Sequence, residues 1–543
     1  MAAVLIALVV VPFVFAIATF LVPFPVARVL TVVSGAITFG LALVLVPTAT
    51  NHAQVTAGSL LRVDALSMVF LVATTFLYGA TAVFAGGYLH LGQGATGRRY
   101  SRRFYAGLNL FCWAMVAAPL VNGLALLWVA IEITTVISAL LVAIDNTDGA
   151  TEASWKYVVI ASLGLGIALF ATILLYYAGS TVFGSAYDLS YPKLLSGAAH
   201  FPPNVVRLSF VMAVLGFGTK MGLFPVHTWL PDAHSEAPTP VSALLSGALL
   251  ALCFYAILRY YQIAIRTMGP TFPRNVFLVF GIASLLLAAL YLLSQRDLKR
   301  MLAYSSIEHM GILAIGMSFA SPVAVFGVLL HVLAHAAGKG TAFFGAGSVV
   351  RKFGTKDLAT IRGGVGVLPW SGPMMVAAVM ALSAMPPFGI FRSEFLIVSG
   401  GLSDPRDTVT AVLVILVTVA FFGLSWSTTQ TMLTPDALAV GRQAVTVVSV
   451  AHDRVATGGP VAAAGPVALS TTPGDEVTLG DEAVIEVEAV EEVDGMLERG
   501  EVSTWIVVSM CIGLAALVVL GVHLPAQLTA LLHHATDQLG SPR

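Results

Sequence analysis

The sequence is poor in charged residues. Lys, Arg, Asp and Glu together make up 10% of its 543 residues, whereas hydrophobic residues make up 58%. A soluble domain of this length needs more charge than that to cover its surface, so we expect the chain to lie mostly in a membrane. The formal net charge of −1 leaves no basic excess for binding nucleic acid, which we exclude as a partner.

Cysteine is equally scarce. Cys112, Cys253 and Cys511 lie far apart, each within an apolar run, and predict neither a disulfide framework nor a cysteine metal site. The glycines of Gly164-Leu165-Gly166 lie inside an expected helix with no strand before them, so they indicate helix packing and not dinucleotide binding. We therefore expect no cofactor in this chain, and any electron transfer belongs to another subunit.

Apolar stretches long enough to cross a bilayer as helices recur along nearly the whole chain. They predict an all-α polytopic membrane protein of about fourteen transmembrane helices. The first stretch is longer than a signal-peptide core and has no basic start, so we interpret it as a helix of the mature protein. In order, the expected helices cover residues 2–22, 26–46, 65–87, 105–120, 123–144, 157–178, 205–224, 240–264, 275–294, 301–320, 322–348, 365–402, 408–432 and 503–523.

Two of these helices are expected to be interrupted. Helix 12 is too long for one straight crossing and contains Pro386, Pro387 and Gly389. Helix 7 is expected to be loosened by three glycines close to its end. These glycines are Gly216, Gly218 and Gly222. Because the two breaks lie five helices apart, and an odd shift reverses the direction of a helix, we predict two inverted five-helix repeats.

The predicted organisation has five parts. Helices 1–3 (1–104) precede a first repeat of helices 4–8 (105–264) and a second repeat of helices 9–13 (275–432). An acidic linker (434–500) leads to the last helix and tail (501–543). The alternating Val484-Ile485-Glu486 stretch hints at a short strand within this linker, although an irregular acidic segment fits its composition better.

Basic residues set the expected orientation in the membrane. Three clusters follow helices 3, 9 and 11 and therefore share one side, which we assign to the cytoplasm, with the linker on that side and both termini outside. Their members are Arg98, Arg99, Arg102 and Arg103; Arg296, Lys299 and Arg300; and Arg351, Lys352 and Lys356. Arg259, Arg266 and Arg274, near the connection between helices 8 and 9, argue for the opposite orientation.

Several ionisable residues lie inside the expected helices. An ionisable group at the centre of a membrane helix costs about 3 kcal/mol on insertion scales, so each one invites a functional interpretation. They are Glu132, Lys220, His331, His335, Lys339 and Glu394. A buried acid and lysine can simply hold two helices together. However, acids, lysines and histidines on helices 5, 7, 11 and 12 favour a lateral proton relay in which an acid near a lysine stabilises the protonated amine.

The segment after helix 7 contains further polar residues. His227, Asp232, His234 and Glu236 match no standard metal-ligand spacing. We predict a structured cytoplasmic turn where protons are taken up, and no metal site. No serine or cysteine nucleophile motif is present, so we expect no catalytic residue in this chain.

Long motifs then identify a family. The stretches 220–234, 237–245, 297–306 and 335–339 resemble the antiporter-like subunits of complex I, and the resemblance covers about helices 3 to 13. Within that family, Ser305-Ser306-Ile307-Glu308-His309-Met310-Gly311 and the stretch 387–395 most resemble hydrogenase-4 component F, found with membrane-bound nickel–iron hydrogenases and formate hydrogenlyases.

The resemblance implies a role for each matching residue. Glu132 and Lys220 match the paired acid and lysine of the first half-channel, and Lys339 matches the central lysine. Glu394 matches the residue at the exit. The two histidines on the central lysine's helix correspond to His331 and His335.

One departure concerns helix 8, where relatives often have a lysine or histidine. Here 246–253 has none, so a link between Lys220 and Lys339 needs water or Ser246. The resemblance further implies other membrane subunits, surrounding lipid, and a peripheral redox arm with iron–sulfur clusters as partners, in the cell's inner (plasma) membrane.

Two alternatives stay open. The same membrane module occurs in multi-subunit cation/proton antiporters and in inorganic-carbon uptake systems, neither of which is driven by redox chemistry. A structural subunit whose channel no longer conducts is the other alternative, and the absence of an ionisable residue from helix 8 agrees with it.

Overall fold

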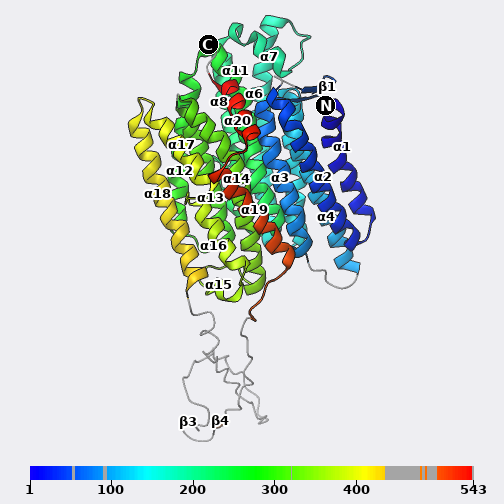
Figure 1. Cartoon of the computed structure of the whole chain (residues 1–543), viewed down its shortest axis with the longest axis vertical. Helices are drawn as coiled ribbons and strands as arrows, with labels where there is room; N and C mark the ends of the chain where they lie inside the picture. Colours follow the sequence, from blue (N-terminus) through cyan, green and yellow to red (C-terminus); the bar gives the residue numbers. More distant parts are fainter. Residues whose placement is uncertain are drawn as a thin grey trace, which may run out of the picture.

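Long helices run side by side along one axis of the molecule (Figure 1). The computed structural model describes residues 1–51, 55–89, 95–319, 321–434, 477–479, 483–485 and 498–540. The strands within this part pair antiparallel as two small ribbons, β1 (Val55–Ala57) with β2 (Leu61–Val63) and β3 (Val477–Leu479) with β4 (Ala483–Ile485). β4 contains the Val484-Ile485 pair that hinted at a strand, and most of the expected linker lies outside the described residues.

The first half of the bundle contains α1 (Ala2–Leu21), α2 (Phe24–Asn51), α3 (Ala65–Tyr88), α4 (Ala95–Ala117), η1 (Ala118–Leu120), α5 (Leu124–Val142), η2 (Ala143–Asp145), α6 (Asp148–Phe183), α7 (Tyr191–Gly197), η3 (Ala198–His200), α8 (Pro203–Met221), α9 (Trp229–Glu236), α10 (Thr239–Leu244), the π-helical turn η4 (Leu245–Leu249) and α11 (Leu250–Met268). The second half contains α12 (Thr271–Leu292), α13 (Leu298–Ser318), α14 (Pro322–Phe353), α15 (Gly364–Val367), α16 (Ser371–Leu382), α17 (Gly389–Leu402), α18 (Asp407–Thr428), the π-helical turn η5 (Thr429–Leu433), α19 (Thr504–Val522) and α20 (Ala526–Leu539).

The composition of these helices confirms a polytopic membrane protein. In the part of the chain that the structure describes, ten helical segments are long and apolar enough to cross a membrane. α4, α8, α13 and the pair α16 and α17 occupy the other expected positions but are more polar or shorter. The number fourteen, and the division into inverted repeats, therefore stay predictions.

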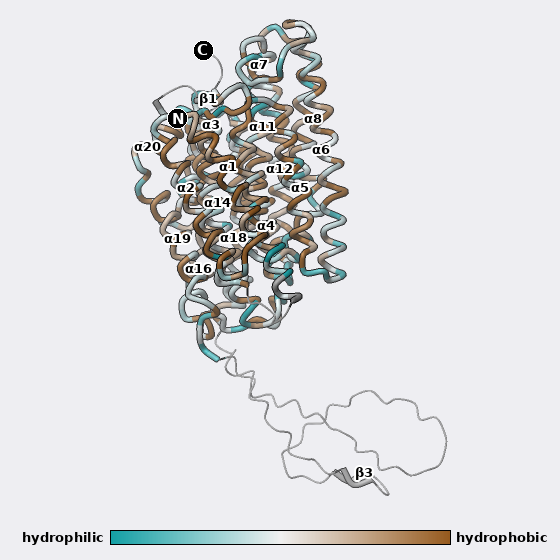
Figure 2. The backbone as a smooth tube through the Cα atoms, turned by 90° about the vertical axis from the view of Figure 1, so that its right-hand side faces the viewer, coloured by the Kyte–Doolittle hydropathy of each residue, from teal (hydrophilic) through white to brown (hydrophobic). Residues whose placement is uncertain are grey.

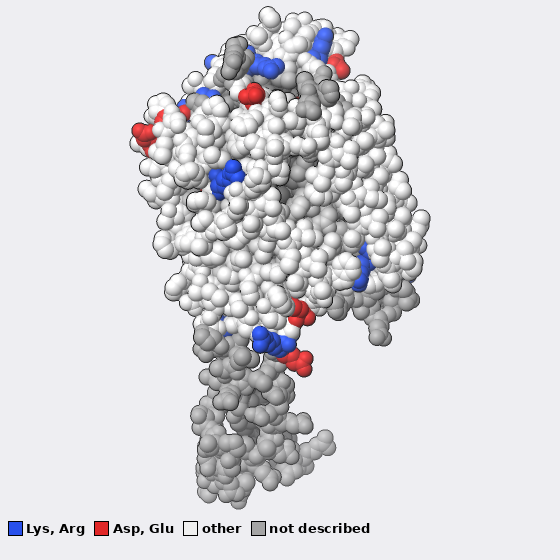
Figure 3. Space-filling model, in the orientation of Figure 1, with Lys and Arg blue, Asp and Glu red and all other residues white. Residues whose placement is uncertain are grey.

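The distribution of polarity along the helices is that of a bilayer protein. Hydrophobic residues dominate the middle of the bundle (Figure 2), and most of the charged side chains on the face shown in Figure 3 lie toward its two ends. Large apolar side chains such as Leu140, Val279 and Trp426 are 66% to 70% exposed on the outward faces of α5, α12 and α18. Lipid is the solvent that makes such exposure favourable.

Both expected helix breaks are present. α8 ends at Met221, Gly222 adopts a positive φ of 85°, and the chain resumes as α9. α16 and α17 are separated by the segment around Pro386 and Pro387. The α19 helix braces this second break, because a Cβ on Gly521 would collide with the Pro387 carbonyl oxygen.

One part of the prediction for helix 7 is wrong. Gly216 and Gly218 do not loosen the helix, because α8 is continuous through both. A Cβ on Gly216 would lie 2.5 Å from the backbone nitrogen of Ala168 and 2.7 Å from the carbonyl oxygen of Gly164 in α6. Gly216 therefore allows close backbone packing between α6 and α8, and Gly164 has the packing role that the sequence indicated.

The basic clusters share one end of the bundle, as expected. The backbone of Leu298 donates to Lys356, and that of Leu358 donates to Arg296, so the segments that follow α12 and α14 lie together. This is the lower end in Figure 1, near α15, whereas the start of α1 and the α20 helix lie toward the upper end.

Arg259, one of the three arginines that favoured the opposite orientation, is neutralised by a carboxylate. Its Nη2 atom lies 2.7 Å from Asp64 Oδ1, and both side chains are at most 2% exposed. Burial by itself raises the pKa of the Asp64 carboxyl, but the guanidiniums of Arg259 and Arg62 outweigh burial and lower that pKa to about 2. Asp64 also caps α3 through the backbone N–H of Ser67.

We expect the Gly216→Ala substitution to lower stability by about 1–3 kcal/mol, because the new methyl group would collide with the α6 backbone at Ala168 and Gly164 and with the Cβ of Ala168. Gly166→Ala in α6 is the matched control, since its Cβ would have no atom within 4 Å and alanine favours the helix by up to about 1 kcal/mol. Thermal unfolding of both variants in detergent measures the difference. Equal melting temperatures for the two variants would contradict the close packing of α6 and α8.

The buried ion pair predicts a dependence of stability on pH. The pKa of Asp64 is lower in the folded chain than its unfolded value of about 3.9. Its stabilising contribution of about 2 kcal/mol is therefore complete above pH 4 and is lost as the pH falls toward 2. Asp64→Asn should remove this acid-sensitive part and, by leaving Arg259 unpaired, cost about 3–5 kcal/mol at neutral pH. Acid titrations of the unfolding temperature of both proteins test this, and an unchanged acid limb in the variant would refute it.

Candidate functional site

A line of polar side chains crosses the apolar interior of the bundle. It contains all six ionisable residues selected from the sequence, on α5, α8, α14 and α17, together with residues of η4 and α13. Lys220, His331, His335 and Lys339 are fully buried, Glu394 is 8% exposed and Glu132 is half-buried. The spacing of His331, His335 and Lys339 along α14 does place them on one face, as expected.

Lys220, at the end of α8, is held by the neighbouring helix α5. Its Nζ atom donates to the Ile131 carbonyl oxygen at 2.8 Å and to the hydroxyls of Thr134 and Thr135 at 2.7 and 2.5 Å. These groups lie three and four residues after the carbonyl, so one helical turn presents all three acceptors. Three acceptors match the three N–H donors of an ammonium group.

The expected ion pair between Lys220 and Glu132 is not formed. Among the described residues, no cationic group lies within 4 Å of the Glu132 carboxylate, although Lys220 is within electrostatic range. Glu132 Oε1 accepts from the Ser162 hydroxyl at 3.2 Å, and its other oxygen is buried without a hydrogen bond. Ser162 in turn lines a cavity of about 320 Å³ between α5 and α6 on the outer surface. The hydroxyls of Thr134 and Thr135 are nearer to the lysine and take the place of the acid.

Lys339 has a closely similar cradle on α13. Its Nζ atom donates to the Leu302 carbonyl oxygen at 3.0 Å and to the Ser305 hydroxyl. Ser306, the next residue, shares a 2.6 Å hydrogen bond with Ser246. A carbonyl at one position with hydroxyls three and four residues later is therefore present on both α5 and α13.

Ser246 lies in the middle of the bundle, where the sequence analysis required a link. It belongs to the π-helical turn η4 and is fully buried. The hydrogen bond between the Ser246 and Ser306 hydroxyls connects this turn to the α13 segment that holds Lys339. These hydrogen bonds thus connect η4, which belongs to the eighth helix expected from the sequence, with the segment that holds Lys339. Among the described residues no hydrogen bond joins Ser246 directly to Lys220.

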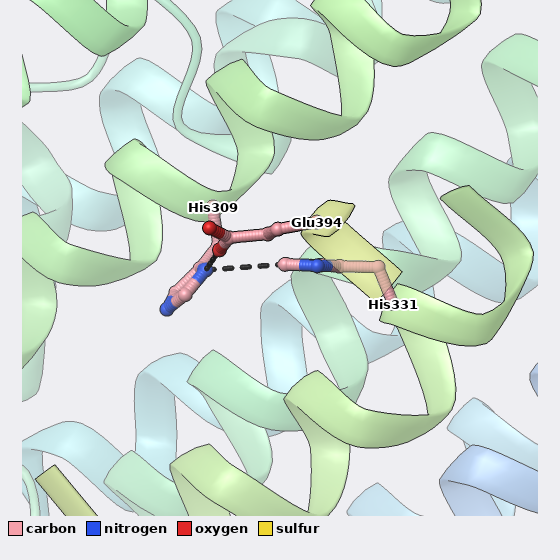
Figure 4. Close-up of side chains that lie close together, drawn as sticks. All are labelled: His309, His331 and Glu394. Carbon is pink, nitrogen blue, oxygen red and sulfur yellow. Dashed lines mark hydrogen bonds and ion pairs between the residues drawn. The ribbon is translucent and has the colours of Figure 1, made fainter. Parts of the chain in front are cut away.

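A cluster of imidazoles and a carboxylate continues from Lys339 toward α17. His331 Nε2 lies 3.1 Å from His309 Nδ1, and His309 Nδ1 lies 3.9 Å from Glu394 Oε1 (Figure 4). The rings of His309 and His335 are 5.2 Å apart. His309, on α13, is therefore the centre of this cluster, although it was not among the selected residues.

Glu308, like His309, was not predicted as a site residue from the sequence. Both are buried in α13, and Glu308 is within electrostatic range of Lys339. The sequence did contain a signal for them, because two adjacent ionisable residues lie well inside the apolar run that forms α13. The insertion cost that selected Lys339 and Glu394 would have selected them too.

Hydrogen-bond directions in the imidazole cluster follow from one hydroxyl. Ser393 donates to the Ile390 carbonyl oxygen at 2.7 Å, so its oxygen accepts at 2.9 Å from the Nδ1–H of His331. A neutral His331 then has its lone pair on Nε2, which accepts from the Nδ1–H of His309. The remaining nitrogen of His309, Nε2, has a lone pair and no hydrogen bond to the described residues.

The predicted turn after helix 7 is structured and carries charge at one end of the bundle. Glu236 lies 2.6 Å from Lys356, and Asp232 lies 3.1 Å from Lys156. Both acids line a surface cavity of about 420 Å³ at the end where the basic clusters lie. Its wall contains charged side chains of both signs: the acids Glu152, Asp232, Glu236 and Asp297 and the bases Lys156, Arg300 and Lys356.

The two histidines of this segment lie deeper than the cavity. His234 is fully buried, donates from its Nδ1–H to the Leu230 carbonyl oxygen at 2.8 Å, and lies 5.7 Å from the ring of Phe343 on α14. Phe343 is one helical turn from Lys339. His227 is 6% exposed and stacks near Phe224. His234 therefore connects α9, whose Asp232 and Glu236 line the charged cavity, with α14, the helix that carries Lys339.

Comparison with known proteins places this arrangement in context. The family model described as NADH:quinone oxidoreductase/Mrp antiporter, TM, matches residues 121–423. The hydrogenase-4 component F homolog of Methylacidiphilum infernorum (isolate V4) is 37% identical over 355 residues, which cover 64% of this chain and 73% of the relative. NADH-quinone oxidoreductase subunit N of Desulforudis audaxviator (strain MP104C) is 32% identical over 365 residues, 67% of this chain and 71% of that protein.

A solved structure shares the fold. A chain of the Mrp complex from Dietzia sp. DQ12-45-1b superimposes with a TM-score of 0.77 at 18% sequence identity, over 99% of this chain and 97% of that one. The similarity extends over the whole bundle, beyond the segment that the family model matches.

The direction of the histidine hydrogen bonds is testable without any assay of function. We expect both His331 and His309 to carry the proton on Nδ1. The Ser393 oxygen accepts from His331 Nδ1–H, and His331 Nε2 accepts from His309 Nδ1–H. Nitrogen-15 NMR of histidine-labelled protein in nanodiscs measures both tautomers. Ser393→Ala should mix the tautomers of His331 and leave the exposed His533 and His534 signals unchanged. Protonation of wild-type His331 at Nε2 would contradict the assignment.

Proposed function

This chain belongs to the NADH:quinone oxidoreductase/Mrp antiporter transmembrane family, and we propose that it moves protons across the membrane as the antiporter-like subunit of a redox-driven complex. The observation that carries the proposal is the line of buried ionisable and hydroxyl groups from Lys220 to Glu394. Burying so many polar groups costs free energy that a passive membrane scaffold has no need to spend.

In this proposal the charged cavity beside Glu236 takes up protons from the cytoplasm. His234 lies on the way inward, close to the α14 turn that carries Lys339. Glu132 and Lys220 form the switch: a Glu132 carboxylate that approaches Lys220 stabilises the ammonium, and its withdrawal favours release of a proton. Since Thr134 and Thr135 hold the amine in the present geometry, the described structure represents the separated arrangement.

Transfer then proceeds along hydroxyls and imidazoles. Ser246 and Ser306 link η4 to the α13 segment that holds Lys339, and His309 links Lys339 to Glu394. Four buried atoms near Lys339 have no hydrogen bond to the described residues: Glu308 Oε2, His309 Nε2, His335 Nδ1 and His335 Nε2. Buried polar atoms of this kind are normally satisfied by water, so we propose a hydrated segment here that passes protons to the histidines.

Glu394 is the proposed exit. It is the acid of the line on α17, directly after the helix break, and its side chain is 10% exposed, whereas Lys339, His309 and His331 are sealed. The break places a carboxylate at the end of the histidine cluster on the side away from Lys339. A proton that reaches His331 or His309 thus has a carboxylate acceptor that borders the surface.

We propose that the partners are other membrane subunits and a peripheral arm with iron–sulfur clusters, in the plasma membrane. The relatives support this, because they are named as components of hydrogenase-4 and of NADH-quinone oxidoreductase. We also propose that this chain binds no redox cofactor. Its cysteines support that assignment, since Cys112 and Cys253 are buried singly and Cys511 stands alone.

Replacement of the central lysine tests the proposal. Lys339→Met should reduce redox-driven proton flux into membrane vesicles at least about tenfold, since it removes the transferable proton, while part of the redox turnover persists. Lys352→Met is the matched control, because the same change is made on the same helix near its end, beyond the polar line. Flux is followed with a pH-sensitive dye and assembly by size-exclusion chromatography. Full flux in an assembled Lys339→Met complex would refute the proposed role.

A cation/proton antiporter subunit is the second candidate. The family description names the Mrp antiporter, and a chain of an Mrp complex has the same fold. The metal and flavin content of the purified assembly separates the two. Iron, nickel or flavin in stoichiometric amounts supports the redox complex. Their absence, together with proton movement that depends on a sodium gradient, supports the antiporter.

A further inference from the structure

The cluster around His309 has a feature that the proton route does not require. Three atoms able to ligate a metal converge from three helices, one each from His309 on α13, His331 on α14 and Glu394 on α17. His309 Nδ1, His331 Nε2 and one Glu394 oxygen all lie within 4.8 Å of one another (Figure 4). We propose that these residues form a binding site for Zn²⁺, or for a transition-metal ion of similar preference, that blocks the chain's interior.

The separations fit a small tetrahedral ion. Ligand atoms about 2.0–2.2 Å from zinc stand about 3.3 Å apart in a tetrahedron. The His309 to His331 nitrogen distance is 3.1 Å, and the His309 to Glu394 distance is 3.9 Å. A rotation of the Glu394 side chain that brings its oxygen about 0.6 Å nearer to His309 gives the tetrahedral separation, and the same oxygen starts within 4.8 Å of the His331 ligand atom. A water molecule or the second carboxylate oxygen completes the fourth position.

The surroundings orient the ligands as metal sites require. The Ser393 hydroxyl accepts the Nδ1–H of His331, which directs the Nε2 lone pair at the cluster. Coordination through His309 Nδ1 needs that ring to carry its proton on Nε2, which is the buried nitrogen that has no hydrogen bond to the described residues. The tautomer change therefore breaks no contact other than the His309 to His331 hydrogen bond that the metal replaces.

The ligand types select among cations. Two neutral imidazoles and one carboxylate suit zinc and copper, whereas Na⁺, Mg²⁺ and Ca²⁺ prefer sites made of oxygen atoms. The side chain of Glu394, 10% exposed, offers a route into the cluster from outside. Other charged or titratable groups nearby, Lys339, Glu308 and His335, do not belong to the converging set.

A consequence for transport rests on the proposed function. An ion held by His309, His331 and Glu394 occupies the lone pairs and the carboxylate that would pass protons from Lys339 to the exit. Micromolar Zn²⁺ should then stop proton flux. The binding itself does not depend on proton flux, so it can be measured separately.

The test is zinc binding to the full-length chain in nanodiscs. All measurements use a background of His533→Ala and His534→Ala, which removes two adjacent exposed histidines of α20. We expect one zinc ion per chain in competition with a fluorescent chelator. His309→Ala, His331→Ala and Glu394→Gln should each weaken binding by at least about tenfold, and Ser393→Ala by a similar factor, because even indirect supports of metal sites cost that much. His335→Ala is the matched control and should retain the wild-type affinity.

X-ray absorption of bound Zn²⁺ and the visible spectrum of bound Co²⁺ decide the matter even where a variant fails to fold. Two imidazole nitrogens in a four-coordinate site support the proposal. Wild-type affinity in the three ligand variants, loss of zinc only in His335→Ala, an all-oxygen six-coordinate site, or no stoichiometric zinc would each overturn it. If zinc binds as expected but Lys339→Met still conducts protons, the metal site stands and the proton route fails.

Discussion

A buried lysine in an apolar helix bundle must find acceptors for its N–H groups, and this requirement organises the interior of the protein. Lys220 and Lys339 both find them on a neighbouring helix, in a backbone carbonyl oxygen and in hydroxyls one turn further along. An acid is not the direct partner in either case. A carbonyl with hydroxyls three and four residues later is a local pattern, so one short helical segment is enough to accept a lysine from the next helix.

The rest of the bundle holds these helices at the required separation. Glycines such as Gly216 remove the side chain where α8 meets the backbone of α6, which fixes the level at which Lys220 meets α5. At the other break, α19 packs its Gly521 against the Pro387 carbonyl and keeps α17 beside α14. The Glu394 carboxylate is thereby presented to His309 and not to lipid.

Much of this could be predicted from sequence because its causes are local. The Pro386-Pro387 pair cannot continue a helix, and the cost of burying charge selects Lys339 and Glu394 without any knowledge of the fold. Whether Glu132 and Lys220 form an ion pair could not be predicted from local sequence. Which acceptor a lysine reaches depends on the rotation of α5, and Thr134 and Thr135 face Lys220 while Glu132 faces Ser162.

The two lysine cradles differ in a way that bears on their roles. Lys220 donates to three acceptors, which use all the N–H groups of an ammonium. Within the described part of the chain Lys339 donates to two acceptors, and near it lie buried atoms of Glu308 and His335 that have no hydrogen-bond partner there. A saturated amine needs a displaced partner before it can exchange a proton, whereas an amine with a free donor can exchange at once. We therefore propose that the first site responds to a moving charge and that the second passes protons on.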